Sequence, residues 1–364
     1  MADTRASTIS PAAASKSATE TPRRLAKLEV SLGAIVENWR TFAQLGSAEA
    51  AAVIKADAYG MDAKAVARAL AAAGCRTFFV ATRGEGLEAR ATLGEGPRIL
   101  VLNGIGLGEA AAFREAKLEP VLNSIDQVRA WREGAYTLHV DTGMNRLGMP
   151  LGDLGEVTRA PMTIMSHLAC ASDRAHPMNA AQRTRFIEAA QRFPGAQKSL
   201  SASAGALLGP DYAFDIIRPG IGLYGGGPMD NDNPTLAVVA RLEAPILQVR
   251  AVMKGETIGY GATFTASKAI KTATCAIGYA DGFLRSASGK GYGWLKGKVC
   301  PILGRVSMDL VTLDVSAVKD ARVGDAVEFL GAEVRLDAVA AAAETIPYEV
   351  LTNLGGRVRR VIAP

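Results

Sequence analysis

The residue best suited to covalent chemistry is a lysine placed directly after an apolar run. Lys55 follows Val53 and Ile54 and precedes Asp57 and Tyr59. A lysine at the end of a buried strand loses hydration, which disfavours its charged form and lowers its pKa. Schiff-base chemistry needs an amine of this kind. The same pattern also fits a lysine whose stem covers apolar surface while its ammonium reaches water.

Two further side chains could carry protons. Tyr260 lies between Gly259 and Gly261, and glycines let a backbone approach a ligand closely. A phenol is a poor base at neutral pH unless cationic or hydrogen-bonding neighbours stabilise the phenolate. His167 is one of three histidines and follows an apolar run. Both residues also fit structural roles, as a core tyrosine with a bonded hydroxyl and a satisfied histidine.

Eight apolar runs precede residue 226 and alternate with helical patterns. Most are continuously apolar, which is typical of parallel strands buried on both faces. Eight strand-helix units in about 200 residues predict an α/β fold with a (β/α)8 TIM barrel, whose functional residues gather at the carboxyl ends of the strands. A doubly wound open sheet is the alternative. The runs are Ala51–Ala56, Thr77–Ala81, Ile99–Asn103, Glu119–Leu122, Thr137–Asp141, Thr163–His167, Lys198–Ser203 and Asp215–Arg218.

The pattern changes after about residue 240 to strands without long helices between them. We predict a barrel over 25–240 and a mostly-β domain over 241–364, with a segment at 28–35 able to add an edge strand to it. Residues 1–24 are rich in alanine, serine and threonine, which predicts a disordered tail. The later strands are predicted at Val249–Met253, Thr272–Ile277, Val299–Leu303, Val311–Val315 and Ala326–Leu330.

Composition excludes several classes of protein. Of 364 residues, 49% are hydrophobic and 21% charged, which is a globular balance. The net charge of +5 comes from scattered residues without an aromatic-interleaved basic patch, so we expect no nucleic-acid partner. The four cysteines form no CxxC pair, which predicts no metal site and no disulfide framework. Without a 20-residue apolar run or a secretory signal, we expect no membrane partner and a cytoplasmic location.

The segment around Lys55 resembles the cofactor-lysine motif of the pyridoxal-phosphate-dependent alanine racemases. Seven further stretches follow in that family's order, and the resemblance extends from about residue 28 to the end of the chain. It implies a barrel plus a β domain, pyridoxal 5'-phosphate as cofactor, interconversion of L- and D-alanine for peptidoglycan, and a homodimer with shared active sites. The stretches are Asp141–Gly148, Ser166–Ala169, Arg218–Gly225, Gly259–Phe264, Gly278–Gly282, Gly304–Asp309 and Tyr348–Leu351.

The resemblance assigns the proton chemistry to Lys55 and Tyr260, on opposite faces of the cofactor. His167 is implied to link Arg218 to Tyr260, and Arg218 to face the pyridine nitrogen. A guanidinium does not give up its proton, so it leaves that nitrogen unprotonated and weakens the electron sink. A less stabilised carbanion is reprotonated promptly, which favours racemisation over transamination.

The resemblance also implies the binding residues. Arg146 would clamp the substrate carboxylate, assisted by the backbone N–H of Met308. Without the resemblance, Arg146 could face solvent and Met308 could fill a core. Gly220 could equally form a turn after Pro219. The residues implied to bind the cofactor are Lys55, Tyr59, Ser203, Arg218, Gly220, Ile221 and Tyr348.

One departure from the family bears on substrate binding. Many relatives carry a lysine, often carbamylated, two residues before Asp141, where this chain has His139. A histidine does not supply the negative charge of a carbamate, so we expect a bound anion such as chloride, or a water, to hold Arg146. The sequence leaves open a serine or broad-specificity racemase, because a methylene is worth only ~1–3 kcal/mol in a pocket. A non-catalytic barrel that binds pyridoxal phosphate is the other alternative.

Overall fold

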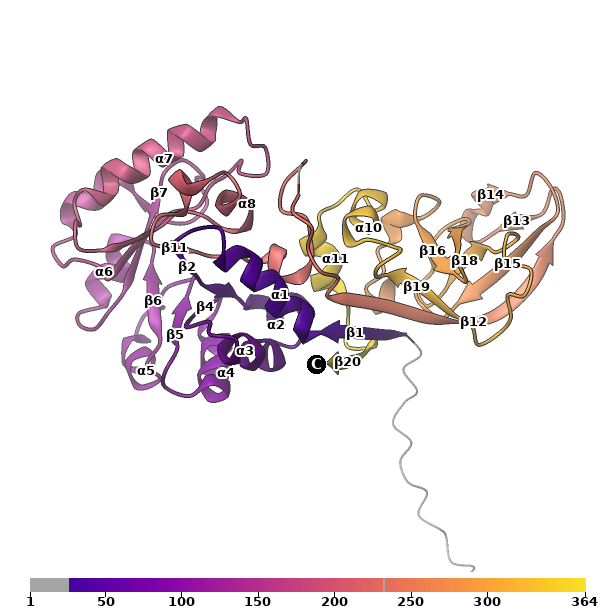
Figure 1. The fold of residues 1–364 in the computed structure, drawn as a ribbon, viewed down its shortest axis with the longest axis horizontal. Helices are drawn as coiled ribbons and strands as arrows, with labels where there is room; N and C mark the ends of the chain where they lie inside the picture. The colour runs from indigo at the N-terminus through magenta and orange to yellow at the C-terminus, as the bar shows by residue number, and fades with distance from the viewer. Residues whose placement is uncertain (1–25, 232) are drawn as a thin grey trace, which may run out of the picture.

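A barrel covered by helices and a lobe built from strands lie side by side, and the long strand β12 (Ala240–Val252) runs along the strand-built lobe (Figure 1). The computed structural model describes residues 26–231 and 233–364. The tail predicted over 1–24 lies outside the described residues. Strand β12 begins at residue 240, but the division into folding units at 240/241 stays a prediction.

The strands of the barrel follow one another in chain order around a ring. Neighbours pair in parallel from β3 through β10. β11 pairs with β2, and the Asp215 N–H donates to the Lys198 carbonyl, which closes the ring. All eight predicted runs supply strands, so the barrel is confirmed and the open sheet is wrong. The strands are β2 (Glu49–Ala50), β3 (Ala52–Val53), β4 (Thr77–Val80), β5 (Arg98–Val101), β6 (Glu119–Leu122), β7 (Thr137–Asp141), β9 (Thr163–Met165), β10 (Gln197–Ser199) and β11 (Ile216–Ile217), with β8 (Met149–Pro150) beside β7.

Helices connect these strands, and several begin at residues whose side chains cap them. The Asp62 carboxylate accepts from the Ala65 N–H at 3.0 Å, and the Ser124 hydroxyl from the Gln127 N–H at 3.3 Å. None of the helices in the described residues has the length and apolar character needed to cross a membrane. The helices are α1 (Leu32–Ala43), α2 (Lys55–Gly60), α3 (Ala63–Ala72), α4 (Arg83–Leu93), α5 (Ala110–Glu115), α6 (Ile125–Ala130), η1 (Leu151–Glu156), α7 (Pro177–Ala190), α8 (Ser203–Ala206), α9 (Pro210–Ala213) and η2 (Ile221–Tyr224).

The second lobe is built on a sheet of order β17-β16-β19-β12-β1-β20, with β15 pairing β12 and β18. The predicted later strands are confirmed with shifted ends, and two short helices follow them. Its elements are β1 (Lys27–Ser31), β13 (Thr257–Ile258), η3 (Tyr260–Ala262), β14 (Phe264–Thr265), β15 (Ile270–Cys275), η4 (Tyr279–Asp281), η5 (Arg285–Ala287), β16 (Tyr292–Leu295), β17 (Lys298–Pro301), β18 (Val311–Asp314), β19 (Ala326–Leu330), α10 (Leu336–Ala342), α11 (Pro347–Asn353) and β20 (Arg359–Ala363).

Strand β1 corrects the expectation of an edge strand over 28–35. It lies between β12 and β20 and is therefore internal to the sheet. It ends at Ser31, because the Ser31 hydroxyl accepts from the Ala34 N–H at 3.2 Å and caps α1. The residues from Leu32 onwards are helical. The N-terminal segment thus ties the second lobe to the first helix of the barrel.

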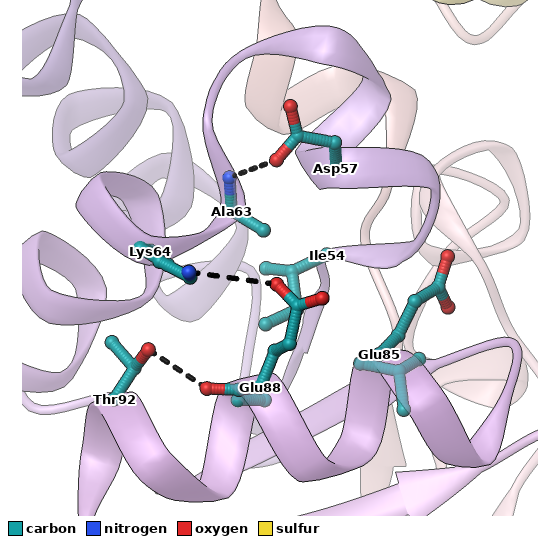
Figure 2. Close-up of a pocket in the computed structure, with 9 residues that line it drawn as sticks. Ile54, Asp57, Ala63, Lys64, Glu85, Glu88 and Thr92 are labelled. Atoms are coloured by element: carbon teal, nitrogen blue, oxygen red, sulfur yellow. Dashed lines mark hydrogen bonds and ion pairs between the residues drawn. The ribbon is translucent and has the colours of Figure 1, made fainter.

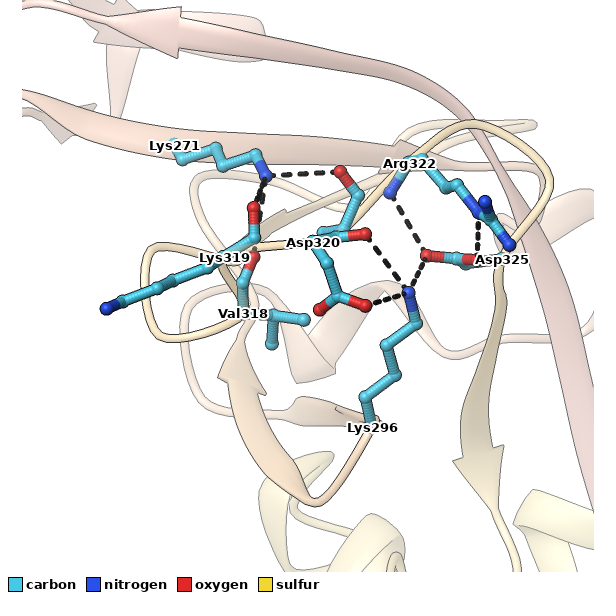
Figure 3. Close-up of polar contacts among 8 residues, drawn as sticks. Lys271, Lys296, Val318, Lys319, Asp320, Arg322 and Asp325 are labelled. Carbon is cyan, nitrogen blue, oxygen red and sulfur yellow. Dashed lines mark hydrogen bonds and ion pairs between the residues drawn. The ribbon is translucent and has the colours of Figure 1, made fainter.

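Two lysines fix the loop between β18 and β19 at the surface of the second lobe (Figure 3). The Lys271 ammonium donates to the carbonyls of Lys319 at 2.9 Å and Ala321 at 3.1 Å. Lys296 pairs with Asp320 at 2.9 Å and Asp325 at 2.8 Å. These contacts attach the loop to β15 and to the turn between β16 and β17, so we assign them to local stability.

Candidate active site

Lys55 begins a strained turn at the carboxyl end of β3. The residues Ala56–Tyr59 have φ angles between 53° and 58°, in the left-handed region. Such a conformation costs roughly 1–2 kcal/mol for each residue that has a Cβ. The Glu85 carboxylate accepts from the Ala56 N–H at 2.8 Å, and the Asp57 carboxylate accepts from the Ala63 N–H at 2.8 Å. The turn is therefore held by side chains on both sides, which fixes where Lys55 and Tyr59 lie.

A cavity of about 260 Å³ lies beside this turn, between α2, α3 and α4 (Figure 2). Lys55 does not line it. Its polar groups already contact one another, since Lys64 pairs with Glu88 at 3.7 Å and Thr92 donates to the Glu88 carbonyl at 2.8 Å. We therefore do not assign the chemistry to this cavity.

The Lys55 amine has a lowered pKa. Burial is the largest cause, and the positive charge of Arg146 lowers the pKa further, while Glu85 opposes both. A lowered pKa increases the fraction of neutral amine at any pH below the ordinary value. The structure thus gives Lys55 the property that covalent and base chemistry require.

Arg218, which is buried, and His167, which is half-buried, form a pair at the carboxyl ends of β11 and β9. The Arg218 guanidinium donates to the Ser199 hydroxyl at 2.6 Å and the Ser166 carbonyl at 2.8 Å, and its Nη2 lies 3.3 Å from His167 Nδ1. A guanidinium only donates, so His167 Nδ1 is the acceptor. The proton of the neutral ring is therefore on Nε2, the nitrogen away from Arg218.

The charges of this pair follow from its burial. Desolvation lowers the pKa of Arg218 to about 9, so the guanidinium keeps its charge at neutral pH. Burial, and then the charge of Arg218, hold the pKa of His167 well below its ordinary value. The pair consists of a cation and a neutral imidazole that can donate through Nε2.

The residues predicted to bind the cofactor phosphate come together beside η2. The Ser203 hydroxyl accepts from the Gly220 N–H at 2.8 Å and from the Gly222 N–H at 3.3 Å. A Cβ on residue 220 would lie 2.4 Å from the Tyr59 hydroxyl oxygen, so only glycine fits. The Tyr348 ring centroid lies 5.9 Å from that of Tyr59. With Ile221, which begins η2, these groups form a neutral, donor-rich cradle suited to a phosphate.

His139 is buried in β7 and neutral. The Asn123 amide nitrogen donates to the carbonyls of Leu102 and Val121, at 3.1 and 2.8 Å, which leaves the Asn123 oxygen to accept from His139 Nδ1 at 2.7 Å. Burial is the main cause that lowers the pKa of His139 to about 4. His139 therefore carries no positive charge at neutral pH, and its lone pair is on Nε2.

Arg146 lies in the exposed loop after β7. Its charge lowers the pKa values of Lys55, His139 and His167, which places it within electrostatic reach of all three. Within 26–231 and 233–364, no carboxylate forms an ion pair with it. A free guanidinium near the Lys55 amine is suited to a carboxylate ligand.

Tyr260 and Met308 lie in the second lobe, apart from these residues. Their side chains are 72% and 52% exposed. Tyr260 begins η3, between β13 and β14, which Figure 1 places at the end of the lobe away from the barrel. A Cβ on Gly261 would lie 2.9 Å from Arg305, so η3 and the segment leading to Met308 are neighbours. Within one chain, the structure does not bring Tyr260 to Lys55.

Sequence reasoning missed three residues that hold the site. Glu85, Asn123 and Arg360 contact the Lys55 turn, His139 and Gly60. Only Glu85 has a local signal, because it is the third residue of the helix capped by Thr82 and closes a capping box. The contacts of the other two depend on residues that the fold brings together from distant positions.

Two family models match the chain in succession. The alanine racemase N-terminal domain matches residues 30–228, and the alanine racemase C-terminal domain matches residues 239–362. The alanine racemase of Acidiphilium cryptum is 44% identical over 351 residues, which cover 92% of this chain and 98% of that protein. The biosynthetic alanine racemase of Agrobacterium fabrum is 43% identical over 363 residues, covering 92% of this chain and 93% of that protein.

Solved structures agree in fold along nearly the whole chain. The crystal structure of alanine racemase from Bartonella henselae with covalently bound pyridoxal phosphate has a TM-score of 0.88 at 36% identity, covering 93% of this chain and 99% of that one. Biosynthetic alanine racemase from Pseudomonas aeruginosa has a TM-score of 0.89 at 34% identity, covering 94% and 100%. Matches of this extent in both lobes show that the chain belongs to the alanine racemase family.

Proposed function

We propose that the chain interconverts L- and D-alanine with pyridoxal 5'-phosphate, using Lys55 of one copy and Tyr260 of a second copy on opposite faces of the substrate. One observation carries the proposal. A half-buried Lys55 of lowered pKa, the Arg218–His167 pair and the Gly220 cradle gather at one end of the barrel, in a member of the alanine racemase family. In a bacterial cytoplasm, the product D-alanine would supply peptidoglycan.

The residues present fit the cofactor. Lys55 would hold it covalently, and Arg218 would face its ring nitrogen as a donor that does not transfer its proton. Its phosphate would be bound by the hydroxyls of Tyr59, Ser203 and Tyr348 and the backbone of Gly220 and Ile221. When bound, pyridoxal phosphate supplies an electron sink that makes the substrate Cα–H acidic enough to remove.

Lys55 would act as the base on one face. Its lowered pKa makes the neutral amine accessible without strongly alkaline conditions. The glutamate and aspartate that hold the left-handed turn fix the backbone from which the amine reaches the substrate. The same amine, once protonated, would return the proton in the reverse direction.

Tyr260 of the second copy would act on the other face. Its phenolate needs a donor, and the Nε2–H of His167 is available because Nδ1 accepts from Arg218. The charge on Arg218 polarises the imidazole and strengthens it as a donor. The Arg218–His167 pair would thus stabilise an anion supplied by another chain.

Arg146 would bind the substrate carboxylate, with the backbone N–H of Met308 from the second copy. Neutral His139 supplies no negative charge to brace Arg146, so we propose that a chloride ion or a water does so. His139 can still accept a hydrogen bond through Nε2, which favours a neutral bridge over direct ion pairing.

A homodimer follows from the incompleteness of one chain. Lys55 and Tyr260 lie in different lobes, and the exposure of Tyr260 leaves it accessible to a second copy. Two copies related by a two-fold axis would each offer a second lobe to the other's barrel, giving two equivalent sites.

The experiment is an assay of the purified chain in deuterated water. We expect pyridoxal phosphate to attach to Lys55, where borohydride traps it, and expect either enantiomer of alanine to give both enantiomers with deuterium at Cα. Serine and larger amino acids, assayed in parallel, test the broad-specificity alternative. Cofactor binding without racemisation of any amino acid would contradict the proposal and favour a non-catalytic barrel.

A further inference from the structure

Arg360 joins two segments that are far apart in the chain. It lies on β20, which pairs in parallel with β1. Its guanidinium donates to three backbone carbonyls, those of Gly60 at 2.8 Å, Leu354 at 2.7 Å and Gly355 at 3.1 Å. Gly60 is the last residue of the Lys55 turn, and Leu354 and Gly355 follow α11. One side chain therefore holds the turn and the end of α11 together.

The two joined segments carry the two tyrosines of the phosphate cradle. Tyr59 is the neighbour of Gly60, and Tyr348 is in α11. The turn also packs closely on α11, because a Cβ on Gly60 would lie 3.0 Å from the Leu351 carbonyl oxygen. The separation of the two rings therefore depends on how the turn meets α11, which is where Arg360 lies.

Physical chemistry explains why an arginine occupies this position. The left-handed turn is strained and persists only if its surroundings hold it. The carbonyls at the end of a helix lack partners within the helix and need donors. A planar guanidinium presents several donors in a fixed geometry, whereas an ammonium is a compact point charge on a flexible stem. Arg360 satisfies both needs at once.

We propose that Arg360 is a positioning residue that locks the Lys55 turn against α11 and so keeps Tyr59 and Tyr348 at the spacing that a phosphate requires. This inference rests on the proposed cofactor site. It concerns ligand affinity rather than proton transfer, since Arg360 contacts backbone carbonyls of the turn and of the residues after α11 rather than the catalytic side chains. The neighbouring Arg359 is exposed and provides a matched control.

The experiment measures binding to the apo chain. Arg360→Met and Arg359→Met are titrated with pyridoxal phosphate, and separately with pyridoxal, which lacks the phosphate. We expect Arg360→Met to weaken pyridoxal phosphate binding by about 10-fold, the equivalent of one poorly aligned hydrogen bond, and pyridoxal binding by less than about 3-fold. Arg359→Met should change neither. Thermal unfolding followed by circular dichroism checks that each variant is folded.

The outcomes separate the inference from the proposed function. Equal weakening of both ligands, or no weakening, would overturn the positioning role. If Arg360→Met does not fold, Arg360→Lys replaces it, with an expected selective loss of about 3-fold that an equal loss for both ligands would contradict. These measurements report affinities and not turnover. A wild-type chain that binds pyridoxal phosphate without racemising alanine would therefore contradict the proposed function, while the effect of Arg360→Met on binding could still be measured.

Discussion

The two halves of the proposed site lie in opposite environments. In the barrel, Arg218 is buried and His167 is half-buried, and desolvation is the main cause that lowers the pKa of each. In the second lobe, Tyr260 and Met308 are largely exposed. The Arg218–His167 pair thus has its contacts within one chain, whereas the surroundings of Tyr260 and Met308 depend on what packs against the second lobe.

The preorganised groups of the site lie on the barrel side. The strained turn, the fixed imidazole tautomer and the glycine-only cradle all lie on the barrel side. Groups held in this way resist reorganisation when charge develops nearby. An exposed residue of a second copy can then complete the site, since the donor that it needs is already oriented. Variants in the two halves should therefore fail in different ways.

Lys55→Ala should have the largest effect. It removes both the covalent attachment and one base, so we expect racemisation to fall by at least about 1000-fold in either direction. Lys64→Ala is the matched control, because Lys64 is an exposed lysine of the adjacent helix that pairs with Glu88. Rates from both enantiomers, together with mass spectrometry of the borohydride-reduced chain, provide the measurement. Retention of more than about a tenth of the activity would refute the role of Lys55.

Tyr260→Phe should lower turnover by about 100- to 1000-fold without removing the cofactor. The ring remains, but the proton carrier on one face is lost. Exchange of the Cα proton with solvent should therefore fall much more for one enantiomer than for the other. Tyr292→Phe in the same lobe serves as the control. Equal losses for both enantiomers would show that the assignment of two faces is wrong.

Arg146→Gln should change both the KM for alanine and the pKa of Lys55. Loss of the charged clamp should raise KM for alanine by about 10-fold or more. It should also raise the pKa of Lys55, because the positive charge of Arg146 lowers that pKa in the wild type. An amine reacts when neutral, so labelling of Lys55 in the apo chain should begin at higher pH in the variant. A labelling curve that is unmoved or shifted to lower pH would contradict the electrostatic link.

Lys271→Met should have the smallest effect, because Lys271 lies outside the proposed active site. Its ammonium holds a surface loop of the second lobe through backbone carbonyls (Figure 3). We expect a loss of about 1 kcal/mol in the free energy of unfolding, measured by urea denaturation, with unchanged kcat and KM. A change in either kinetic constant would connect this loop to the site.

Much of the fold could be predicted from sequence because buried parallel strands leave continuous apolar runs. The first run, predicted over 51–56, shows where this signal ends. The strand stops at Val53, and Ala56–Tyr59 turn left-handed although none of these residues is glycine. That conformation depends on Glu85, which binds the Ala56 N–H, and on Arg360, which binds the Gly60 carbonyl from 300 positions away in the chain. No local pattern records a contact of that range.

The sequence predicts which residue types carry the chemistry of the site. It does not predict which nitrogen of each site histidine is protonated. Lys55, His167 and Arg218 follow strands whose positions the sequence predicts. The protonated nitrogen of each imidazole depends instead on its partner, which is an acceptor for His139 and a donor for His167. The sequence also does not predict that Tyr260 is exposed, since its flanking glycines fit a core position as well as a surface one.

Mixing two inactive variants shows whether each active site is divided between two chains. Lys55→Ala and Tyr260→Phe chains carrying different affinity tags are co-expressed, and the mixed dimers are purified through both tags. In each mixed dimer, one site would combine the Lys55 of one chain with the Tyr260 of the other, and the second site would lack both residues. We therefore expect about half the wild-type activity per dimer. Mixed dimers no more active than the better single variant, or the absence of any dimer, would contradict a site divided in this way.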